Sequence, residues 1–282
     1  MSIPNYRLND GHEIPGIGFG TAGLLEDDGY RAVRSAIEVG YRMIDTAMRY
    51  GNEEPVGRAI RDAVAAGDVT RDEITLISKL PGRDHGYDAA RASIEGSLQR
   101  LGLERIDMYL IHWPLPRLNE YVNSFKAMLD ARAEGQIGSV GVCNFTPEYL
   151  RCLIDETGVT PAVNQIQVTP DLPRSDWREV HAELGIVTEA WSPLGGLHGI
   201  GDDTKEVFTG IAEEHGVGFG QAMLRWHTQQ GTVPVVKSGN PDRQRENLDV
   251  FGFDLTDADF ERAAALAKPV HPDWDPETHE EF

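Results

Sequence analysis

Residues 74–113 have the sequence ITLISKLPGRDHGYDAARASIEGSLQRLGLERIDMYLIHW. The stretch begins with an apolar run at 74–80 that has the length of a strand. It continues with a helix-like amphipathic segment at 87–101 and ends in a second apolar run at 106–113. Two apolar strands joined by an amphipathic helix are typical of a parallel βαβ unit. This stretch therefore predicts an α/β fold in which helices cover a parallel sheet.

The same alternation covers most of the 282-residue chain. After a hairpin around residues 8–15, strands are predicted at 16–21, 42–47, 74–80, 106–113, 138–145, 162–168, 186–191 and 232–238. Helices are predicted at 28–39, 53–65, 87–101, 119–134, 147–156, 175–184, 206–215, 219–230, 241–249 and 256–267. This pattern predicts an α/β fold, a (β/α)8 TIM barrel with an N-terminal β-hairpin and extra C-terminal helices, as one domain over residues 1–282. A doubly wound sheet shows the same alternation, so the count alone leaves that alternative open.

A glycine-rich stretch near the start supports the doubly wound alternative. GFGTAG (18–23) matches the dinucleotide-binding pattern G-x-G-x-x-G, and Asp45 follows it at the expected spacing. The surrounding sequence opposes this hypothesis. The preceding residues contain Pro15 and a charged turn instead of a buried apolar strand, and the acids of LLEDDGY (24–30) would repel a pyrophosphate. We therefore favour the barrel, with these glycines forming a tight turn.

Composition excludes several classes of partner. The chain has 46 acidic and 26 basic residues and a net charge of −20, so its surface repels nucleic acid and anionic membrane. The two cysteines, Cys143 and Cys152, offer neither a disulfide framework nor zinc spacing. The first residues lack the pattern of a signal peptide, and no apolar stretch approaches membrane-spanning length. We expect a cytoplasmic monomer that binds no metal, nucleic acid or membrane.

Polar side chains follow three consecutive predicted strands. Asp45 and Tyr50 come after the second strand, Lys79 closes the third, and His112 closes the fourth. Singly, each has an ordinary structural role: a helix cap, a half-buried ring or a satisfied core residue. The carboxyl ends of barrel strands, however, surround one pocket, so together these side chains predict a site.

The four residue types suit one kind of chemistry. A tyrosine with its ordinary pKa of about 10 is a weak acid at neutral pH. We expect the ammonium of Lys79 to lower the pKa of Tyr50, and Asp45 to hold Lys79 in place. His112 would orient a carbonyl oxygen. The set predicts proton donation to an oxygen on which negative charge builds, as in carbonyl reduction.

Later strand ends offer contacts for a hydride-donating cofactor. Asn144 and Gln165 close the fifth and sixth predicted strands with amides, and Trp191 closes the seventh with a flat ring for stacking. The segment KSGNPDRQREN (237–247) concentrates basic residues in an acidic chain and enters a helix N-terminus. This pattern indicates an anion site. A solvated helix face with i,i+4 ion pairs is the alternative.

Taken in order, several stretches resemble the motifs of the aldo-keto reductases. They are GYRMIDTAMRYGNEEPVGRAI (40–60), ISKL (77–80), DMYLIHWP (107–114), VGVCNF (140–145), PAVNQIQVTP (161–170), AWSPLG (190–195) and VVKSGNPDRQRENLDVFGFDLT (235–256). The resemblance runs from about Leu8 to Lys268 and is strongest to the prokaryotic branch that contains the 2,5-diketo-D-gluconic acid reductases.

The resemblance implies NADPH-dependent reduction of small carbonyls, dicarbonyls or keto-sugars to alcohols, with Tyr50 as proton donor supported by Asp45, Lys79 and His112. It implies NADPH/NADP+ contacts at Gly20, Thr21, Asp45, Asn144, Gln165, Trp191, Ser192, Leu194, Lys237, Ser238, Arg243, Glu246 and Asn247. Substrate contacts are implied at Met48, His112 and Trp113. The alternative function is a catalytically weak, NADPH-sensing regulatory subunit on the same fold.

The sequence departs from the family pattern at several points. Cys143 replaces a serine, and QVTP (167–170) replaces the common E-x-H-P, which changes the polarity beside Gln165. Met48 and Ala22 stand where relatives often carry larger or aromatic residues. The tail after Lys268 is short, so we expect a fairly open pocket for small or medium aldehydes and ketones.

Overall fold

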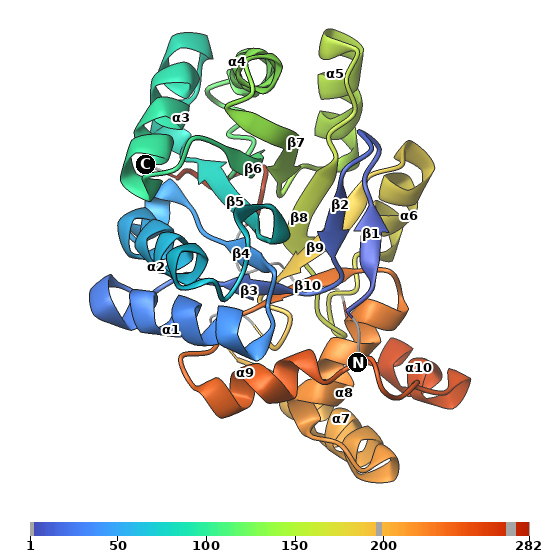
Figure 1. The fold of residues 1–282 in the computed structure, drawn as a ribbon. Coiled ribbons are helices and arrows are strands. Elements are labelled where there is room, and N and C mark those ends of the chain that lie inside the picture. The colour runs from blue at the N-terminus through green and yellow to red at the C-terminus, as the bar shows by residue number, and fades with distance from the viewer. Residues whose placement is uncertain (1–2, 196–198, 269–274, 282) are drawn as a thin grey trace.

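The structure is a closed barrel of eight parallel strands. A computed structural model describes residues 3–195, 199–268 and 275–281. Neighbouring strands pair in the order β10-β3-β4-β5-β6-β7-β8-β9 (Figure 1). The strands are β3 (Gly18–Gly20), β4 (Met43–Asp45), β5 (Thr75–Leu80), β6 (Ile106–Ile111), β7 (Ile137–Cys143), β8 (Val163–Gln167), β9 (Val187–Trp191) and β10 (Val233–Val236). The predicted TIM barrel is confirmed, and the doubly wound alternative is wrong because the eight strands close into a barrel in which Gly18–Gly20 forms β3.

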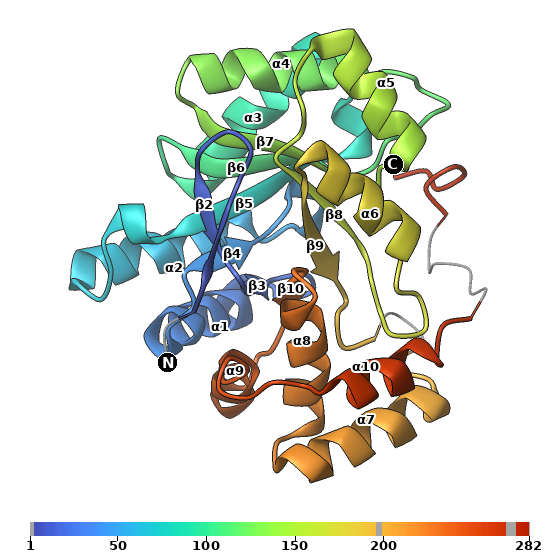
Figure 2. The ribbon, with the colours of Figure 1, turned by 90° about the vertical axis from the view of Figure 1, so that its right-hand side faces the viewer.

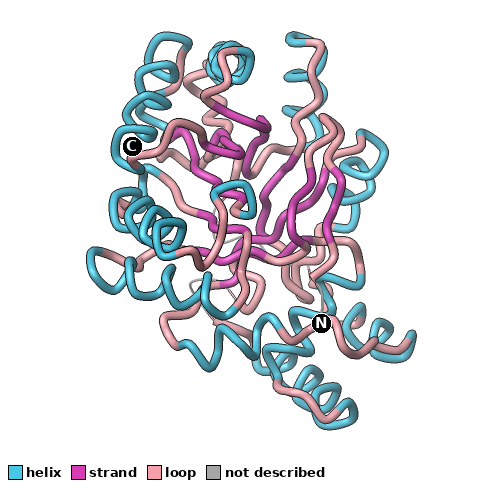
Figure 3. The backbone as a smooth tube through the Cα atoms, in the orientation of Figure 1, coloured by secondary structure: helices cyan, strands magenta, loops and turns pink. Residues whose placement is uncertain are grey.

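Helices surround the barrel on its outer side (Figure 3). They are α1 (Glu26–Val39), α2 (Glu53–Ala66), α3 (Tyr87–Leu101), α4 (Tyr121–Ala133), α5 (Pro147–Thr157), α6 (Ser175–Leu184), α7 (Asp202–His215), α8 (Phe219–Gln229), α9 (Pro241–Leu248) and α10 (Asp257–Ala264). Each predicted helix is present. The largest difference is at α7, which begins at Asp202 instead of residue 206, because Asp202 and Asp203 are favourable in a first helical turn.

The predicted hairpin closes the N-terminal end of the barrel. It consists of β1 (Asn5–Arg7) and β2 (Glu13–Pro15), which pair antiparallel. Leu8 and Ile14 pack with the interior barrel residues Met43, Ile77 and Met108. The hairpin and the C-terminal segment lie on opposite sides of the barrel (Figure 2). The far end of the barrel, where the strands have their carboxyl ends, is therefore left for the site.

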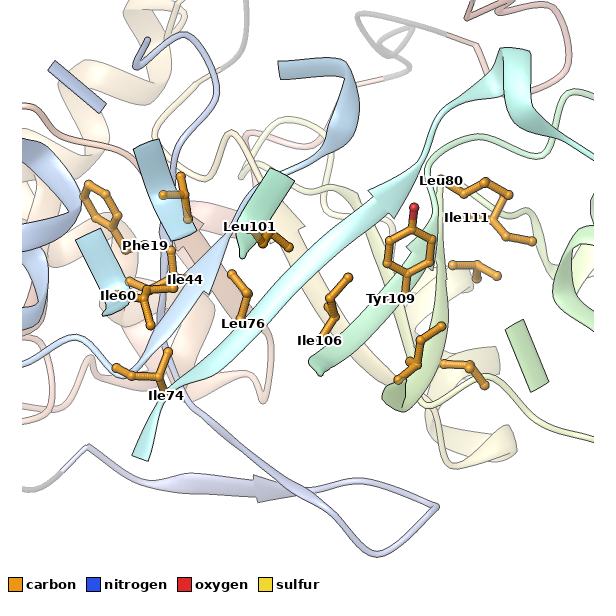
Figure 4. Packing of buried hydrophobic residues seen from close by; sticks show 14 of the residues in the cluster. Phe19, Ile44, Ile60, Ile74, Leu76, Leu80, Leu101, Ile106, Tyr109 and Ile111 are labelled. Carbon is orange, nitrogen blue, oxygen red and sulfur yellow. The ribbon is translucent and has the colours of Figure 1, made fainter. Parts of the chain in front are cut away.

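The pleat of each strand decides which side chains enter the barrel. Along β5, Leu76 and Leu80 belong to the core cluster that packs between the strands and the helices (Figure 4). Ile77 belongs instead to the interior cluster. Side chains alternate along a strand, so Lys79 points to the same side as Ile77, into the barrel. If the Lys79 side chain pointed outward, its ammonium would lie in the apolar layer between the strands and the helices.

The segment after β9 forms a second, smaller core. Helices α7, α8 and α10 lie together at one side of the barrel (Figures 1 and 2). Their apolar faces bury Phe208, Met223, Trp226 and Ala263 against the strand residue Ile166. In the described residues no helix is both long enough and apolar enough to span a membrane.

Two helical glycines give opposite expectations for stability. A Cβ added to Gly57 in α2 would lie 2.0 Å from the carbonyl oxygen of Leu101, a clash with backbone. A Cβ added to Gly210 in α7 would meet only the tip of Arg262, 4.0 Å away. We expect Gly57→Ala to lower the free energy of unfolding by about 1–3 kcal/mol. Gly210→Ala should raise it by about 0.5–1 kcal/mol, because alanine has less freedom when unfolded. Urea unfolding of both variants measures this, and equal stabilities would contradict it.

Candidate active site

A buried ammonium organises the carboxyl ends of β4 and β5. Lys79 Nζ donates hydrogen bonds to Asp45 Oδ1 and Oδ2, both at 2.7 Å, and to the carbonyl oxygen of Thr46 at 3.0 Å. It also donates to the hydroxyl of Tyr50 at 3.3 Å. The Lys79 residue is 0% exposed and Asp45 is 3% exposed. The predicted convergence of these three residues is present in the structure.

The loop that carries Tyr50 is held by buried polar contacts. Tyr50 ends the short 3-10 helix η1 (Met48–Tyr50), which Gly51 terminates with a left-handed φ of 68°. Asn52 donates to the carbonyl oxygens of Thr21 and Leu24, each at 2.8 Å, and accepts from the hydroxyl of Thr46 at 2.7 Å. Because these bonds are buried or partly buried, they fix where the loop places the phenol.

The electrostatics of Tyr50 differ from the sequence expectation. Burial raises the pKa of Tyr50 to about 12, although the Lys79 ammonium beside it acts in the opposite direction. The expected net lowering is wrong, because loss of solvation around the phenol outweighs the nearby charge. Burial also acts to lower the pKa of Lys79, but the surrounding groups, with Asp45 first among them, together more than offset this and the pKa is raised. At neutral pH the site thus contains an ammonium and a phenol that still holds its proton.

A second buried carboxyl group, that of Glu189, shares a hydrogen-bond donor with Asp45. Gln165 lies inside β8, not at its end as predicted, and its Nε2 donates to Asp45 Oδ2 at 2.9 Å and to Glu189 Oε2 at 2.8 Å. Glu189 lies in β9, is 0% exposed, and burial raises its pKa to about 7. Glu189 was not among the predicted site residues. An acid inside the apolar strand IVTEAW (186–191) was the available signal.

A cavity of about 640 Å³ opens beside these groups, at the carboxyl ends of the strands. Its size lies within the range of small-molecule and cofactor sites. The residues predicted for the site that line it are Gly20, Asp45, Tyr50, His112, Trp113, Asn144, Gln165, Trp191, Ser192, Leu194 and Lys237. One continuous cavity therefore joins the proton-transfer residues to the basic residue that follows β10.

Other predicted residues lie behind or beyond the cavity lining. Thr21 is fully buried and donates to the carbonyl oxygen of Asp45 at 2.9 Å. Met48 lies in η1, with its sulfur 3.3 Å from Nη2 of Arg83. Past the cavity, Ser238 precedes α9, and that helix carries Arg243, Glu246 and Asn247.

Asn144 joins three strand ends at the cavity wall. It follows β7 with a left-handed φ of 61°, a conformation that asparagine tolerates better than most residues. Its Oδ1 accepts from the indole Nε1 of Trp191 at 2.9 Å, and its Nδ2 donates to the carbonyl oxygen of His112 at 3.2 Å. Asn144 therefore orients the indole that lines the cavity.

The C-terminal segment, although short, lines the same cavity with His279, Glu280 and Glu281. The ring of His279 lies 4.2 Å from that of Trp113, measured between centroids. Glu281 lies with its Oε1 2.7 Å from Nδ1 of His112. The short tail was expected to leave the pocket fairly open, but these residues form part of the pocket wall.

Comparison with known proteins agrees with this geometry. The model of the aldo/keto reductase family matches residues 16–268. A 2,5-diketo-D-gluconic acid reductase B from Corynebacterium sp. (strain SHS752001) is 48% identical over 281 residues, which cover 100% of this chain and 99% of that protein. The crystal structure of an aldo/keto reductase from Brucella melitensis has a TM-score of 0.88 and 39% identity, covering 94% of this chain and 100% of that one. A Bombyx mori aldo-keto reductase in complex with NADP has a TM-score of 0.87 and 35% identity, covering 94% of this chain and 92% of that one.

The chain belongs to the aldo/keto reductase family. It is therefore an enzyme of the oxidoreductase class, as its sequence motifs imply. The predicted similarity to the 2,5-diketo-D-gluconic acid reductases is also confirmed.

Glu189 makes stability depend on pH. Its pKa in the folded protein, about 7, lies above the ordinary 4.5, so the folded protein binds this proton more tightly than the unfolded chain. The stabilising contribution of this proton to the free energy of unfolding is complete below pH 4.5 and is lost as the pH rises through 7. We expect the free energy of unfolding of the native protein to fall by about 2–3 kcal/mol more than that of Glu189→Gln between pH 4.5 and pH 8. Denaturant titrations at both pH values test this, and parallel pH profiles would contradict it.

Proposed function

We propose that the protein reduces aldehydes and ketones to alcohols with NADPH, using Tyr50 as the proton donor. The observation that carries this proposal is the position of Lys79, a fully buried ammonium between the Asp45 carboxylate and the Tyr50 hydroxyl at the cavity. This arrangement stabilises the phenolate that remains after the phenol has given up its proton.

The groups that surround the cavity suit the parts of NADPH. Trp191, Asn144 and Gln165 line one part with an indole and two amides, the groups expected around a nicotinamide. Lys237 lines another part, and Arg243 lies in the first turn of α9. Within the described residues, neither cation is paired with a carboxylate, so both are available to a phosphate. The NADP complex of the silkworm relative supports this assignment.

The remaining cofactor contacts are proposed from the family pattern. They are Gly20, Thr21, Asp45, Ser192, Leu194, Ser238, Glu246 and Asn247. When bound, NADPH supplies the hydride that the carbonyl carbon accepts.

The residues of this chain supply the proton and the orientation. Tyr50 gives its proton to the carbonyl oxygen as negative charge builds there, and Lys79 stabilises the resulting phenolate while Asp45 keeps Lys79 in place. The rings of His112 and Tyr50 meet edge to face with centroids 5.8 Å apart, so one oxygen can contact both. Met48 and Trp113 are proposed to contact the rest of the substrate.

The substrate class is a small or medium carbonyl compound: a simple aldehyde or ketone, a dicarbonyl or a keto-sugar. The cavity volume supports this size, and the name of the corynebacterial relative supports a keto-sugar acid among the candidates. The assembled set of Asp45, Tyr50, Lys79 and His112 argues against the alternative of a catalytically weak NADPH-sensing subunit. Turnover of a panel of dicarbonyls and aromatic aldehydes distinguishes the two functions.

The protein is proposed to act as a cytoplasmic monomer. Its two cysteines are both unpaired, as suits a reducing compartment, and its net charge of −20 opposes self-association. Light scattering after size-exclusion chromatography measures the oligomeric state.

Removing the phenol oxygen tests the proton donor. We expect Tyr50→Phe to lower kcat for carbonyl reduction by a factor of about 10²–10⁴, because the variant loses the hydroxyl that contacts Lys79 and is proposed to give the proton. NADPH affinity, measured by fluorescence titration, should stay within a fewfold of the native value. Tyr41→Phe is the matched control, since the hydroxyl of Tyr41 is buried without a hydrogen bond to any described residue. A Tyr50→Phe variant with full reductase activity would overturn the proposal.

Neutralising one cation tests the phosphate contact. We expect Arg243→Gln to weaken NADPH binding about ten- to a hundredfold, through loss of a charge-assisted contact, while NADH binding changes little. The control is Arg245→Gln in the same helix, because Arg245 is exposed and already paired with Asp242 at 2.8 Å. Kd values for both cofactors decide the matter. Equal weakening of NADPH and NADH would show that Arg243 does not bind the 2′-phosphate.

A further inference from the structure

A buried amide side chain holds the backbone just beyond the end of β7. Asn164 lies in β8 and is 0% exposed. Its Nδ2 donates a hydrogen bond to the carbonyl oxygen of Phe145 at 2.8 Å, and its Oδ1 accepts one from the backbone N–H of Phe145 at 3.3 Å. One side chain therefore pairs with both backbone groups of one residue, as a neighbouring strand would do.

This clamp lies beside the residue at which the chain turns away from the sheet. Strand β7 ends at Cys143, and Asn144 follows with a left-handed φ of 61°. The backbone N–H of Asn144 still donates to the carbonyl oxygen of Gln165 at 3.1 Å, but the paired register of β7 and β8 ends one residue earlier. Buried backbone groups without partners are costly. Asn164 supplies such partners where the ladder ends, and so it stabilises the turn at Asn144.

The turn decides where the side chain of Asn144 lies. Asn144 lines the cavity, where its Oδ1 accepts a hydrogen bond from Nε1 of Trp191 and its Nδ2 donates to the carbonyl oxygen of His112. A different backbone conformation at Asn144 would displace its amide and release the indole of Trp191. These are two of the groups proposed to surround the nicotinamide.

A histidine on the helical side of the sheet contacts the amide of Asn164 in turn. Helix α6 packs against β9 (Figure 2), and its residue His181 is 0% exposed. Its Nε2 lies 2.9 Å from Nδ2 of Asn164, and its Nδ1 lies 2.8 Å from Oγ1 of Thr188. Asn164 and Thr188 are paired residues of β8 and β9, so their side chains share the face that His181 contacts.

The backbone of Phe145 fixes the direction of each hydrogen bond in this chain. A backbone N–H only donates, so the Asn164 atom facing it is the amide oxygen, and the amide nitrogen faces the carbonyl. The second hydrogen of Nδ2 then points to His181, whose Nε2 accepts it. Burial lowers the pKa of His181 to about 4, so at neutral pH the ring carries its one proton on Nδ1 and donates to Thr188. The four residues thus form one directed network.

We propose that Asn164 and His181 are positioning residues for the nicotinamide end of the cofactor, because they hold the backbone turn that places Asn144 in the cavity wall. This inference rests on the proposed NADPH-dependent function. Neither side chain lines the cavity itself, so both act through Asn144 and the indole of Trp191. The adenosine half of NADPH is proposed to bind at Lys237 and α9, and its binding should not depend on them.

Removing the clamp tests the proposal. We expect Asn164→Ala to weaken NADPH binding about three- to tenfold, because the hydrogen bonds to the carboxamide are misplaced. Adenosine 2′,5′-bisphosphate carries the adenosine and the 2′-phosphate but no nicotinamide, and its Kd should stay native. Isothermal titration calorimetry measures both ligands. Native Kd values for both, or equal weakening of both, would overturn the proposal.

Gln229 provides a matched control for loss of stability. In α8 its Nε2 donates to the carbonyl oxygen of Leu255 and its Oε1 accepts from the N–H of Leu255, each at 2.9 Å. Leu255 belongs to the second core, and neither residue lines the cavity. Gln229→Ala should therefore lower the free energy of unfolding while leaving the Kd of NADPH native. A loss of NADPH affinity in this variant would show that general destabilisation explains the effect.

Two replacements of His181 test the second step, and they still decide the matter if Asn164→Ala does not fold. Glutamine can bring an acceptor near the position of Nε2, whereas the side chain of asparagine is one methylene shorter and reaches only the position of Nδ1. We expect His181→Asn to weaken NADPH binding about two- to tenfold and His181→Gln to keep the native Kd. Native affinity in His181→Asn, or equal losses in both variants, would contradict the role of His181.

The indole N–H of Trp191 reports this positioning without cofactor or turnover. Its ¹H–¹⁵N resonance, assigned with Trp191→Phe, should shift in Asn164→Ala and His181→Asn, because the acceptor Oδ1 of Asn144 moves. It should keep the native position in His181→Gln and Gln229→Ala. An unchanged resonance in both Asn164→Ala and His181→Asn would overturn this inference even in an active reductase. Shifted resonances in a protein that does not use NADPH would instead leave the hold on Asn144 standing and refute the proposed function.

Discussion

The ion pair between Lys79 and Asp45 is the constraint on which the site depends. An ammonium inside a barrel loses its hydration, and the resulting cost is tolerable only with a carboxylate and further acceptors around it. Asp45 and the carbonyl oxygen of Thr46 supply these acceptors, and the alternation along β5 directs Lys79 toward them. The ammonium also donates a hydrogen bond to the hydroxyl of Tyr50. The buried ammonium that needs these acceptors is thus the same group that contacts the phenol proposed to transfer a proton.

The barrel separates its stabilising end from its reactive end. At the N-terminal end the hairpin residues Leu8 and Ile14 close an apolar interior. At the other end the interior becomes polar, where Gln165 joins the carboxyl groups of Asp45 and Glu189. Asp45 has an ammonium partner, whereas Glu189 is held by an amide, and burial raises the pKa of Glu189 to about 7. The N-terminal end of the barrel therefore stabilises the fold, and the other end holds the buried polar and charged groups.

Much of this arrangement could be predicted from the residues in order. Apolar runs with the right lengths indicated the barrel strands, and Asp45, Lys79 and His112 were found because they stand at or beside strand ends. The net pKa shift of Tyr50 was predicted with the wrong sign, because the sequence shows the neighbouring charge but not the loss of water. Gln165 was placed at a strand end, whereas it lies within β8, because strand ends depend on pairing with neighbours and not on local composition.

The sequence by itself determined the alternation of strands and helices, and with it the barrel and the residues at its mouth. The physical reason is that hydrophobic periodicity is local and is repeated in every strand and helix. Only the tertiary structure decided that Glu281 meets His112 and that Gln165 links Asp45 to Glu189. These contacts join segments far apart in the chain, and their strength comes from the exclusion of water, which no short stretch of sequence records.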